Sequence, residues 1–236
     1  MTSEERREIE NNVAQAREKI AAAAVRAGKR PEDILLVAAT KMNDAERVQA
    51  AVQAGIDVCG ENRVQELLGK YEEHAYDGCP LHFIGTLQSN KVKYLIGKVS
   101  MIESVSSVKL AKVIDKEARK AGIVQDILLE VNIGREEAKL GIDPDELPET
   151  LCKIAEMENL RIRGLMAIPP KPDINRENTY YFDRMYQLFI DISAKKYDNV
   201  SIDYLSMGMS ADYEAAISCG ANIVRLGTTL FGARRY

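Results

Sequence analysis

Apolar residues recur at steps of three and four along the first part of the chain, which predicts an amphipathic helix. The positions are Ile9, Val13, Ala16, Ile20, Ala23 and Ala27. Thr2 followed by Glu5 resembles a capping box at the start of this helix, and Gly28 is a natural end. The next apolar stretch, residues 34–39, is continuous rather than alternating. A run of this kind predicts a strand that is buried on both faces.

Strand-like and helix-like patterns then alternate to the end of the chain. We predict further strands at 56–59, 81–84, 101–104, 124–131, 160–166, 202–205 and 222–226. We predict helices at 44–54, from 61 onward, and at 89–96, 107–121, 144–157, 177–195 and 210–218. Together with the strand at 34–39, this makes eight strands that alternate with helices, a pattern typical of a parallel sheet.

Eight such units in 236 residues favour closure into an α/β barrel, the (β/α)8 or TIM barrel, as one domain over residues 1–236. Little chain follows the last strand, so we expect the N-terminal helix to cover the gap where an eighth helix would lie. The alternative is an open doubly wound sheet. It is disfavoured because no glycine-rich dinucleotide turn follows the first strand. A proline cluster at 169–172 predicts a loop, since it lies between a strand and a helix.

Composition narrows the possible functions. The 36 acidic residues slightly outnumber the 32 basic ones, so no excess of positive charge marks a nucleic-acid surface. No apolar run approaches the length of a membrane span, and the first ten residues are too charged for a signal peptide. We therefore expect a cytoplasmic protein with its cysteines as buried thiols. With two histidines, a zinc site is not expected; His74 is predicted at the surface and His82 as a satisfied barrel residue.

The loops after the seventh and eighth strands contain residues suited to a phosphate. In barrels of this kind, sites lie at the carboxyl ends of the strands, and phosphates often bind after strands seven and eight. These loops contain Gly208, Ser210, Gly227 and Thr228. Glycine allows close approach of the backbone, and hydroxyl groups and amides donate to phosphate oxygens. The alternative is that these are ordinary turns and caps, with Ser210 as the N-cap of the following helix.

Lys41 directly follows the first buried strand, where the barrel interior opens. Desolvation there lowers the pKa of an ammonium group, and a neutral amine can form a Schiff base with an aldehyde. The alternative is a solvated lysine in front of a helix.

Arg225 lies in the last strand, two residues before Gly227, and its register can direct it into the barrel. A buried charge needs a partner. The ring nitrogen of a pyridine cofactor is one candidate, and a carboxylate such as Asp203 or Glu103 is the alternative. A lysine, a phosphate site and a residue facing a ring nitrogen are what a pyridoxal 5'-phosphate site requires. Because strand eight closes on strand one, the three would be neighbours.

A series of motifs in this order resembles the family of pyridoxal phosphate homeostasis proteins, single-domain relatives of the fold-type III alanine racemases. These motifs occupy residues 39–41, 60–66, 82–91, 137–141, 163–169, 205–210 and 224–234. Their sequences are Ala-Thr-Lys, Gly-Glu-Asn-Arg-Val-Gln-Glu, His-Phe-Ile-Gly through Gln-Ser-Asn-Lys, Glu-Ala-Lys-Leu-Gly, Arg-Gly-Leu-Met-Ala-Ile-Pro, Leu-Ser-Met-Gly-Met-Ser and Val-Arg-Leu-Gly-Thr through Phe-Gly-Ala-Arg.

The resemblance implies a role for each matching residue. Lys41 would form the covalent Schiff base with pyridoxal 5'-phosphate, and Arg225 would face the pyridine nitrogen. The residues implied to line the cofactor or hold its phosphate are Asn62, Met166, Ser210, Gly227 and Thr228. One departure concerns the family's second lysine and the proline after it: Asn43 and Asp44 occupy these positions here. Lys139 does match a later lysine of the family.

Two functions from different classes remain open at this point. Racemisation needs proton transfer on both faces of the substrate carbanion, and related racemases take the second base from an extra β-domain and from dimerisation. The chain ends at Tyr236, directly after the predicted barrel. We therefore expect no β-domain, a monomer, and a non-enzymatic carrier that buffers pyridoxal phosphate and passes it to apo-enzymes. An amino-acid racemase of the alanine type is the alternative. A barrel aldolase fits less well, because its lysine usually lies deeper in the barrel and on a later strand.

Overall fold

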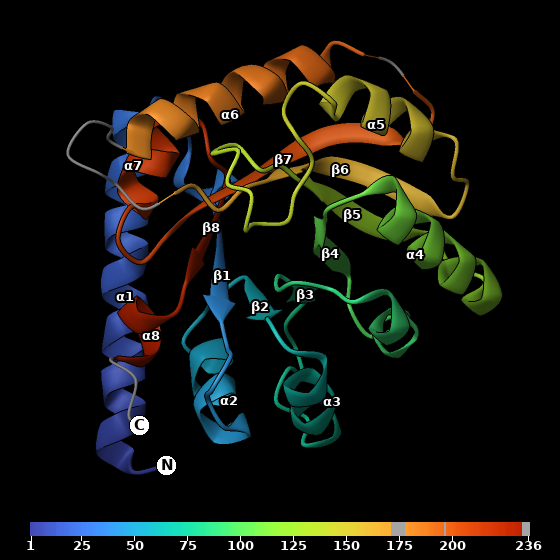
Figure 1. The fold of residues 1–236 in the computed structure, drawn as a ribbon. Helices are drawn as coiled ribbons and strands as arrows, with labels where there is room; N and C mark the ends of the chain where they lie inside the picture. Colours follow the sequence, from blue (N-terminus) through green and yellow to red (C-terminus); the bar gives the residue numbers. More distant parts are fainter. Residues whose placement is uncertain (171–177, 196, 233–236) are drawn as a thin grey trace.

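The computed structural model describes residues 1–170, 178–195 and 197–232, and within them eight parallel strands close into a barrel in sequence order. Figure 1 shows the strands in the centre with the helices around them. The strands are β1 (Leu35–Ala39), β2 (Val58–Glu61), β3 (Leu81–Phe83), β4 (Met101–Val105), β5 (Gln125–Glu130), β6 (Leu160–Met166), β7 (Val200–Met209) and β8 (Ile223–Leu226). Pairing of β1 with both β2 and β8 confirms the predicted barrel and excludes the open sheet.

The α-helices follow the strands, with one additional helix at the N-terminus. They are α1 (Ser3–Arg26), α2 (Ala45–Gln53), α3 (Val64–Glu72), α4 (Val108–Ala121), α5 (Leu147–Ala155), α6 (Asn178–Ser193), α7 (Tyr213–Ser218) and α8 (Thr228–Phe231). In the described ranges, two 3-10 helices cover Pro31–Asp33 and Ser89–Tyr94. The helix predicted at 89–96 is therefore present as a shorter 3-10 helix. The loop expected at 206–209 was wrong, because these residues belong to β7. Three predictions include residues outside the described ranges: residue 172 of the proline cluster, residue 177 of the helix predicted at 177–195, and residues 233–234 of the last motif.

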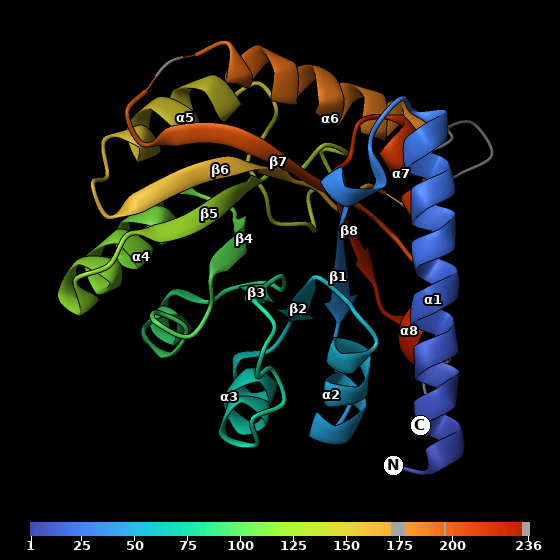
Figure 2. The same ribbon diagram turned by 180° about the vertical axis from the view of Figure 1, so that it is seen from behind.

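Helix α1 covers the side of the barrel where β8 meets β1, as predicted. Its start has the full capping box: the Thr2 side chain accepts from the Glu5 amide, and the Glu5 side chain accepts from the Thr2 amide. Along its length α1 packs against α2, α7 and the short α8, and Figure 2 shows it running beside all three. The Asn12 side-chain amide donates to the carbonyl of Leu230 in α8 at 3.1 Å. The amphipathic pattern at the N-terminus thus supplies the cover that α8 is too short to give.

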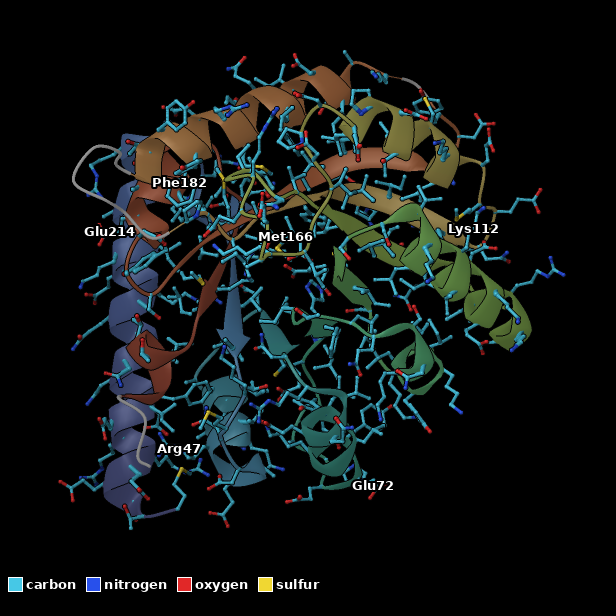
Figure 3. The ribbon with its side chains drawn as sticks, in the orientation of Figure 1. Arg47, Glu72, Lys112, Met166, Phe182 and Glu214 are labelled. Carbon is cyan, nitrogen blue, oxygen red and sulfur yellow. The ribbon has the colours of Figure 1, made fainter. Side chains whose placement is uncertain are left out.

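Apolar side chains fill two layers. Outward-facing strand residues pack under the helices, and Phe182 of α6 is one of the buried residues there (Figure 3). Inward-facing residues form a smaller cluster inside the barrel: Val37, Ala39, Val58, Ile84, Met101, Leu128, Met166 and Ile223. Because strand side chains alternate between the two faces, this inner cluster identifies which residues of each strand point to the barrel axis. None of the helices in the described ranges is long and apolar enough to cross a membrane.

Gly164 makes the contact between β6 and β7 possible. Its φ is +149°, and a Cβ atom at this position would lie 1.8 Å from the carbonyl oxygen of Tyr204. A side chain cannot be accommodated against a neighbouring backbone at that distance. The register between β6 and β7 shifts next to this glycine, between Ile162 and Gly164. The glycine is therefore part of how the barrel closes.

Candidate functional site at the barrel mouth

Lys41 lies two residues beyond Ala39, an inward-facing residue of the barrel, and is half-buried. Strand β1 ends at Ala39, and Lys41 lies in the turn that directly follows it. The two residues that replace the family's second lysine and proline have local roles. The Asn43 side-chain amide donates to the Lys41 carbonyl at 3.1 Å, and Asp44 caps α2 by accepting from the Arg47 amide at 2.9 Å.

Arg225 points into the barrel and is 4% exposed. Its guanidinium donates to the Ser206 hydroxyl and, at 2.9 Å, to the Ala167 carbonyl. Glu103 is the nearest carboxylate, with Oε2 at 3.9 Å from the guanidinium. Asp203, the other partner considered, instead pairs with Arg163 at 2.9 Å. Arg225 is thus held in place by groups of the protein.

Glu103 connects Arg225 to the opposite wall of the barrel. Its carboxylate is fully buried, accepts from the Ser206 hydroxyl at 2.6 Å, and hydrogen-bonds with His82 at 2.7 Å. This confirms the prediction that His82 is a satisfied barrel residue. Burial acts to raise the pKa of Glu103, but the hydrogen bond and charge of His82 and the charge of Arg225 outweigh it and hold the pKa below its usual value. Burial lowers the pKa of Arg225, and nearby carboxylates oppose that shift, Glu103 most strongly.

Ser210 joins the loops that follow β7 and β8. Its hydroxyl oxygen accepts from the amides of Gly227 and Thr229, at 3.2 and 3.3 Å. The alternative, in which Ser210 is the N-cap of the following helix, is wrong, because the N-cap of α7 is Asp212. Thr228 is the exposed first residue of α8. Ser210, Gly227 and Thr228 are nevertheless neighbours, and Gly227 lies beside Ala39 of β1, where an added Cβ would be 3.6 Å from the alanine side chain.

Asn62 directly follows β2, and Met166 is the last residue of β6, so both lie at the carboxyl ends of strands. Met166 is fully buried inside the barrel, and Figure 3 shows it near the centre. The side-chain oxygen of Asn62 is buried and accepts no hydrogen bond from the residues that the structure describes. Gly85 lets the chain after β3 pack closely against the backbone of Asn62, since a Cβ atom at Gly85 would lie 2.2 Å from the Asn62 carbonyl oxygen. An unsatisfied buried oxygen at the mouth needs a donor, and a polar ligand would supply one.

Glu130, the last residue of β5, was missed by the sequence analysis. It follows Leu128 at a spacing of two, so it points into the barrel, and it pairs in register with Met166. Burial raises the pKa of its carboxyl group to about 7, against the lowering effect of Arg225. Its signal was a charged residue directly after the apolar run Ile127–Leu129 of β5. Asn132, two residues further along the chain, has its side chain hydrogen-bonded to the backbone of Glu136 in its own loop.

Other predicted positions lie outside this group. Lys139 pairs with Glu136 and lies 3.5 Å from the carbonyl of Pro169. His74 is exposed and pairs with Asp77 at 3.1 Å. In the described part of the chain, no three histidine, cysteine or carboxylate side chains gather in a way that could hold a metal. The cysteines were expected to be buried, and this holds for Cys59 but not for the exposed Cys152.

The geometry defines a class of protein: an α/β barrel whose mouth gathers a lysine, a buried arginine, an unsatisfied amide oxygen and a bridge between the last two loops. The family model of the alanine racemase N-terminal domain matches residues 6–235. The pyridoxal phosphate homeostasis protein of Aquifex aeolicus is 45% identical over 219 residues, which cover 93% of this chain and 95% of that protein. The one from Escherichia coli K12 is 38% identical, with 97% and 98% covered.

Among solved structures, PipY of Synechococcus elongatus PCC7942 with PLP bound superposes with a TM-score of 0.82 at 30% identity, covering 95% of this chain and all (100%) of that one. This chain therefore belongs to the alanine racemase N-terminal domain family and, within it, to the pyridoxal phosphate homeostasis proteins.

Proposed function

We propose that this chain binds pyridoxal 5'-phosphate covalently through Lys41 and serves as a carrier of the cofactor. The observation that supports this most directly is the buried, unsatisfied side-chain oxygen of Asn62, which lies at the same barrel mouth as Lys41 and Arg225. Relatives at 45% and 38% identity bear the name pyridoxal phosphate homeostasis protein. PipY was solved with this cofactor bound.

Each residue of the mouth has a part in the proposal. When bound, pyridoxal phosphate supplies an aldehyde that condenses with a lysine amine. Lys41 offers that amine from the end of β1, and Met166 gives an apolar wall. Ser210, Gly227 and Thr228 hold the phosphate through hydroxyl and amide donors, since the two loops are already in contact.

Arg225 faces the pyridine nitrogen in this proposal. A guanidinium, held by Ser206 and Ala167, is a permanent cation and a poor proton donor. It disfavours a protonated ring and so weakens the electron sink that amino-acid chemistry on this cofactor requires. The name pyridoxal phosphate homeostasis protein, which the relatives bear, supports storage and delivery in preference to racemisation.

The proposal extends to a cytoplasmic monomer, with residues 1–236 as one functional domain that hands the cofactor to apo-enzymes. Two assays test it. Loaded protein mixed with a pyridoxal-phosphate-dependent apo-enzyme should restore that enzyme's activity faster than spontaneous release permits. A chiral assay with alanine should show no turnover at ordinary enzyme rates. Rapid racemisation by the loaded protein would overturn the carrier function.

A further inference from the structure

Three charged residues next to the mouth are not used by the proposed function. Glu61 ends β2, and Glu66 and Lys70 lie one turn apart on the same face of α3. Glu61 is fully buried and Lys70 is 7% exposed. Their closest ion pair, between Lys70 Nζ and Glu61 Oε2, measures 2.7 Å, and Glu66 Oε2 lies 3.5 Å from the same ammonium. We call these residues the Glu61–Glu66–Lys70 cluster.

The cluster bonds to the backbone on both sides of Lys41. Lys70 Nζ donates to the carbonyl of Thr40 at 2.7 Å. On the other side, the amide of Met42 donates to Glu66 Oε2 at 2.8 Å. Strand β1 ends at Ala39, so these two backbone groups lie beyond the strand. The peptide units that flank Lys41 are therefore held by α3.

The same cluster reaches Asn62. Glu61 Oε1 accepts from the Asn62 amide at 2.7 Å, while Oε2 accepts from the Thr40 hydroxyl at 3.0 Å. One buried carboxylate thus connects the residue before Lys41 with a second residue of the candidate site. The ends of β1 and β2 are fixed relative to each other by this side chain.

The backbone after Lys41 is in an unfavourable conformation. Met42 has a φ of +62°, in the left-handed region that residues with a side chain rarely adopt. Such a conformation persists where surrounding contacts determine it. The charge-assisted bond from the Met42 amide to Glu66 is a contact of this kind. A buried ion pair by itself adds little to the stability of a protein. The hydrogen bonds to the backbone around Lys41 therefore explain the buried charges of the cluster better than stability does.

We propose that Glu61, Glu66 and Lys70 are positioning residues, which fix the backbone on both sides of Lys41 and so set the direction from which its amine meets an aldehyde. This inference rests on the proposed function, in which Lys41 is the cofactor lysine. It predicts that weakening the cluster impairs covalent attachment at Lys41 more than it impairs recognition of the rest of the cofactor.

The test uses Glu66→Ala, since Lys70→Met would leave Glu61 buried without its partner and would risk unfolding. Two ligands are titrated: pyridoxal 5'-phosphate, and pyridoxamine 5'-phosphate, which has no aldehyde. We expect affinity for pyridoxal phosphate to fall on the order of ten- to a hundredfold, the loss of one charge-assisted hydrogen bond. Affinity for pyridoxamine phosphate should change less than about threefold. Glu66→Gln, which keeps an acceptor for the Met42 amide, should recover most of the loss.

The matched control is Glu72→Ala, an exposed residue at the end of the same helix (Figure 3). It should bind both ligands as the wild type does. Equal losses for both ligands in Glu66→Ala, or no loss for either, would overturn the positioning role. If the wild type itself forms no adduct on Lys41, the proposed function fails instead, and borohydride reduction of the wild type reveals that separately.

Discussion

The Glu130 carboxyl group gives the molecule a pH-dependent stability that can be measured without any cofactor. Burial raises the pKa of this group to about 7. In the unfolded chain a glutamate titrates near ~4.3. Between these two values the folded protein keeps the proton that the unfolded chain has lost. Stability therefore falls as the pH rises towards 7, by about 1.4 kcal/mol for each pH step.

Glu130→Gln should remove that dependence. We compare the free energy of unfolding of the variant with that of the wild type at each pH. The difference, variant minus wild type, should increase by about 2–3 kcal/mol from pH 5 to pH 8. Any constant cost of the buried amide cancels in this comparison. Urea unfolding at pH 5, 6, 7 and 8 measures it, with the exposed residue substitution Glu137→Gln as the control. Parallel pH profiles for wild type and Glu130→Gln would refute the reasoning that this carboxyl group titrates inside the barrel.

Three further predictions follow from single contacts. Ser210→Ala leaves the amides of Gly227 and Thr229 without their acceptor, so fluorescence titration should show affinity for pyridoxal phosphate falling about tenfold, and affinity for pyridoxal much less. Arg225→Met removes a cation near Glu103; urea unfolding should show a loss of about 3 kcal/mol, and the bound cofactor's absorbance should shift. Gly164→Ala forces a Cβ against a carbonyl oxygen, and thermal melting should show a loss of about 3 kcal/mol or more. An unchanged spectrum in the second case, or unchanged melting in the third, would contradict these assignments.

The barrel was predictable because its buried parallel strands leave continuous apolar runs and its helices leave a clear period. Predictions from the local sequence pattern failed where contacts between residues distant in the sequence determine the structure. Residues 206–209 contain Ser206 and Gly208 and resemble a loop, yet they extend β7 because Met209 pairs with Arg225 of β8. Ser210 is of a residue type that often caps helices and lies just before one, yet its hydroxyl accepts from amides 17 and 19 residues away.

The residues of the candidate site likewise fall into those that the sequence predicted and those that it missed. Lys41, Arg225 and Gly227 follow from the rule that sites lie at the carboxyl ends of barrel strands. Glu130 was missed because no candidate was taken from within β5, of which it is the last residue. The bond from Lys70 to the Thr40 carbonyl joins residues 30 apart through a side chain and a backbone group. Periodicity carries no information about such a contact.

The central claim is that Lys41 carries the cofactor. Purified protein incubated with pyridoxal phosphate should be reduced with borohydride, digested and analysed by mass spectrometry, beside Lys41→Ala and the exposed-lysine control Lys93→Ala. The account predicts one reduced adduct on the peptide containing Lys41, its absence in Lys41→Ala and full labelling in Lys93→Ala. An adduct on another lysine, or stoichiometric labelling of Lys41→Ala, would contradict it.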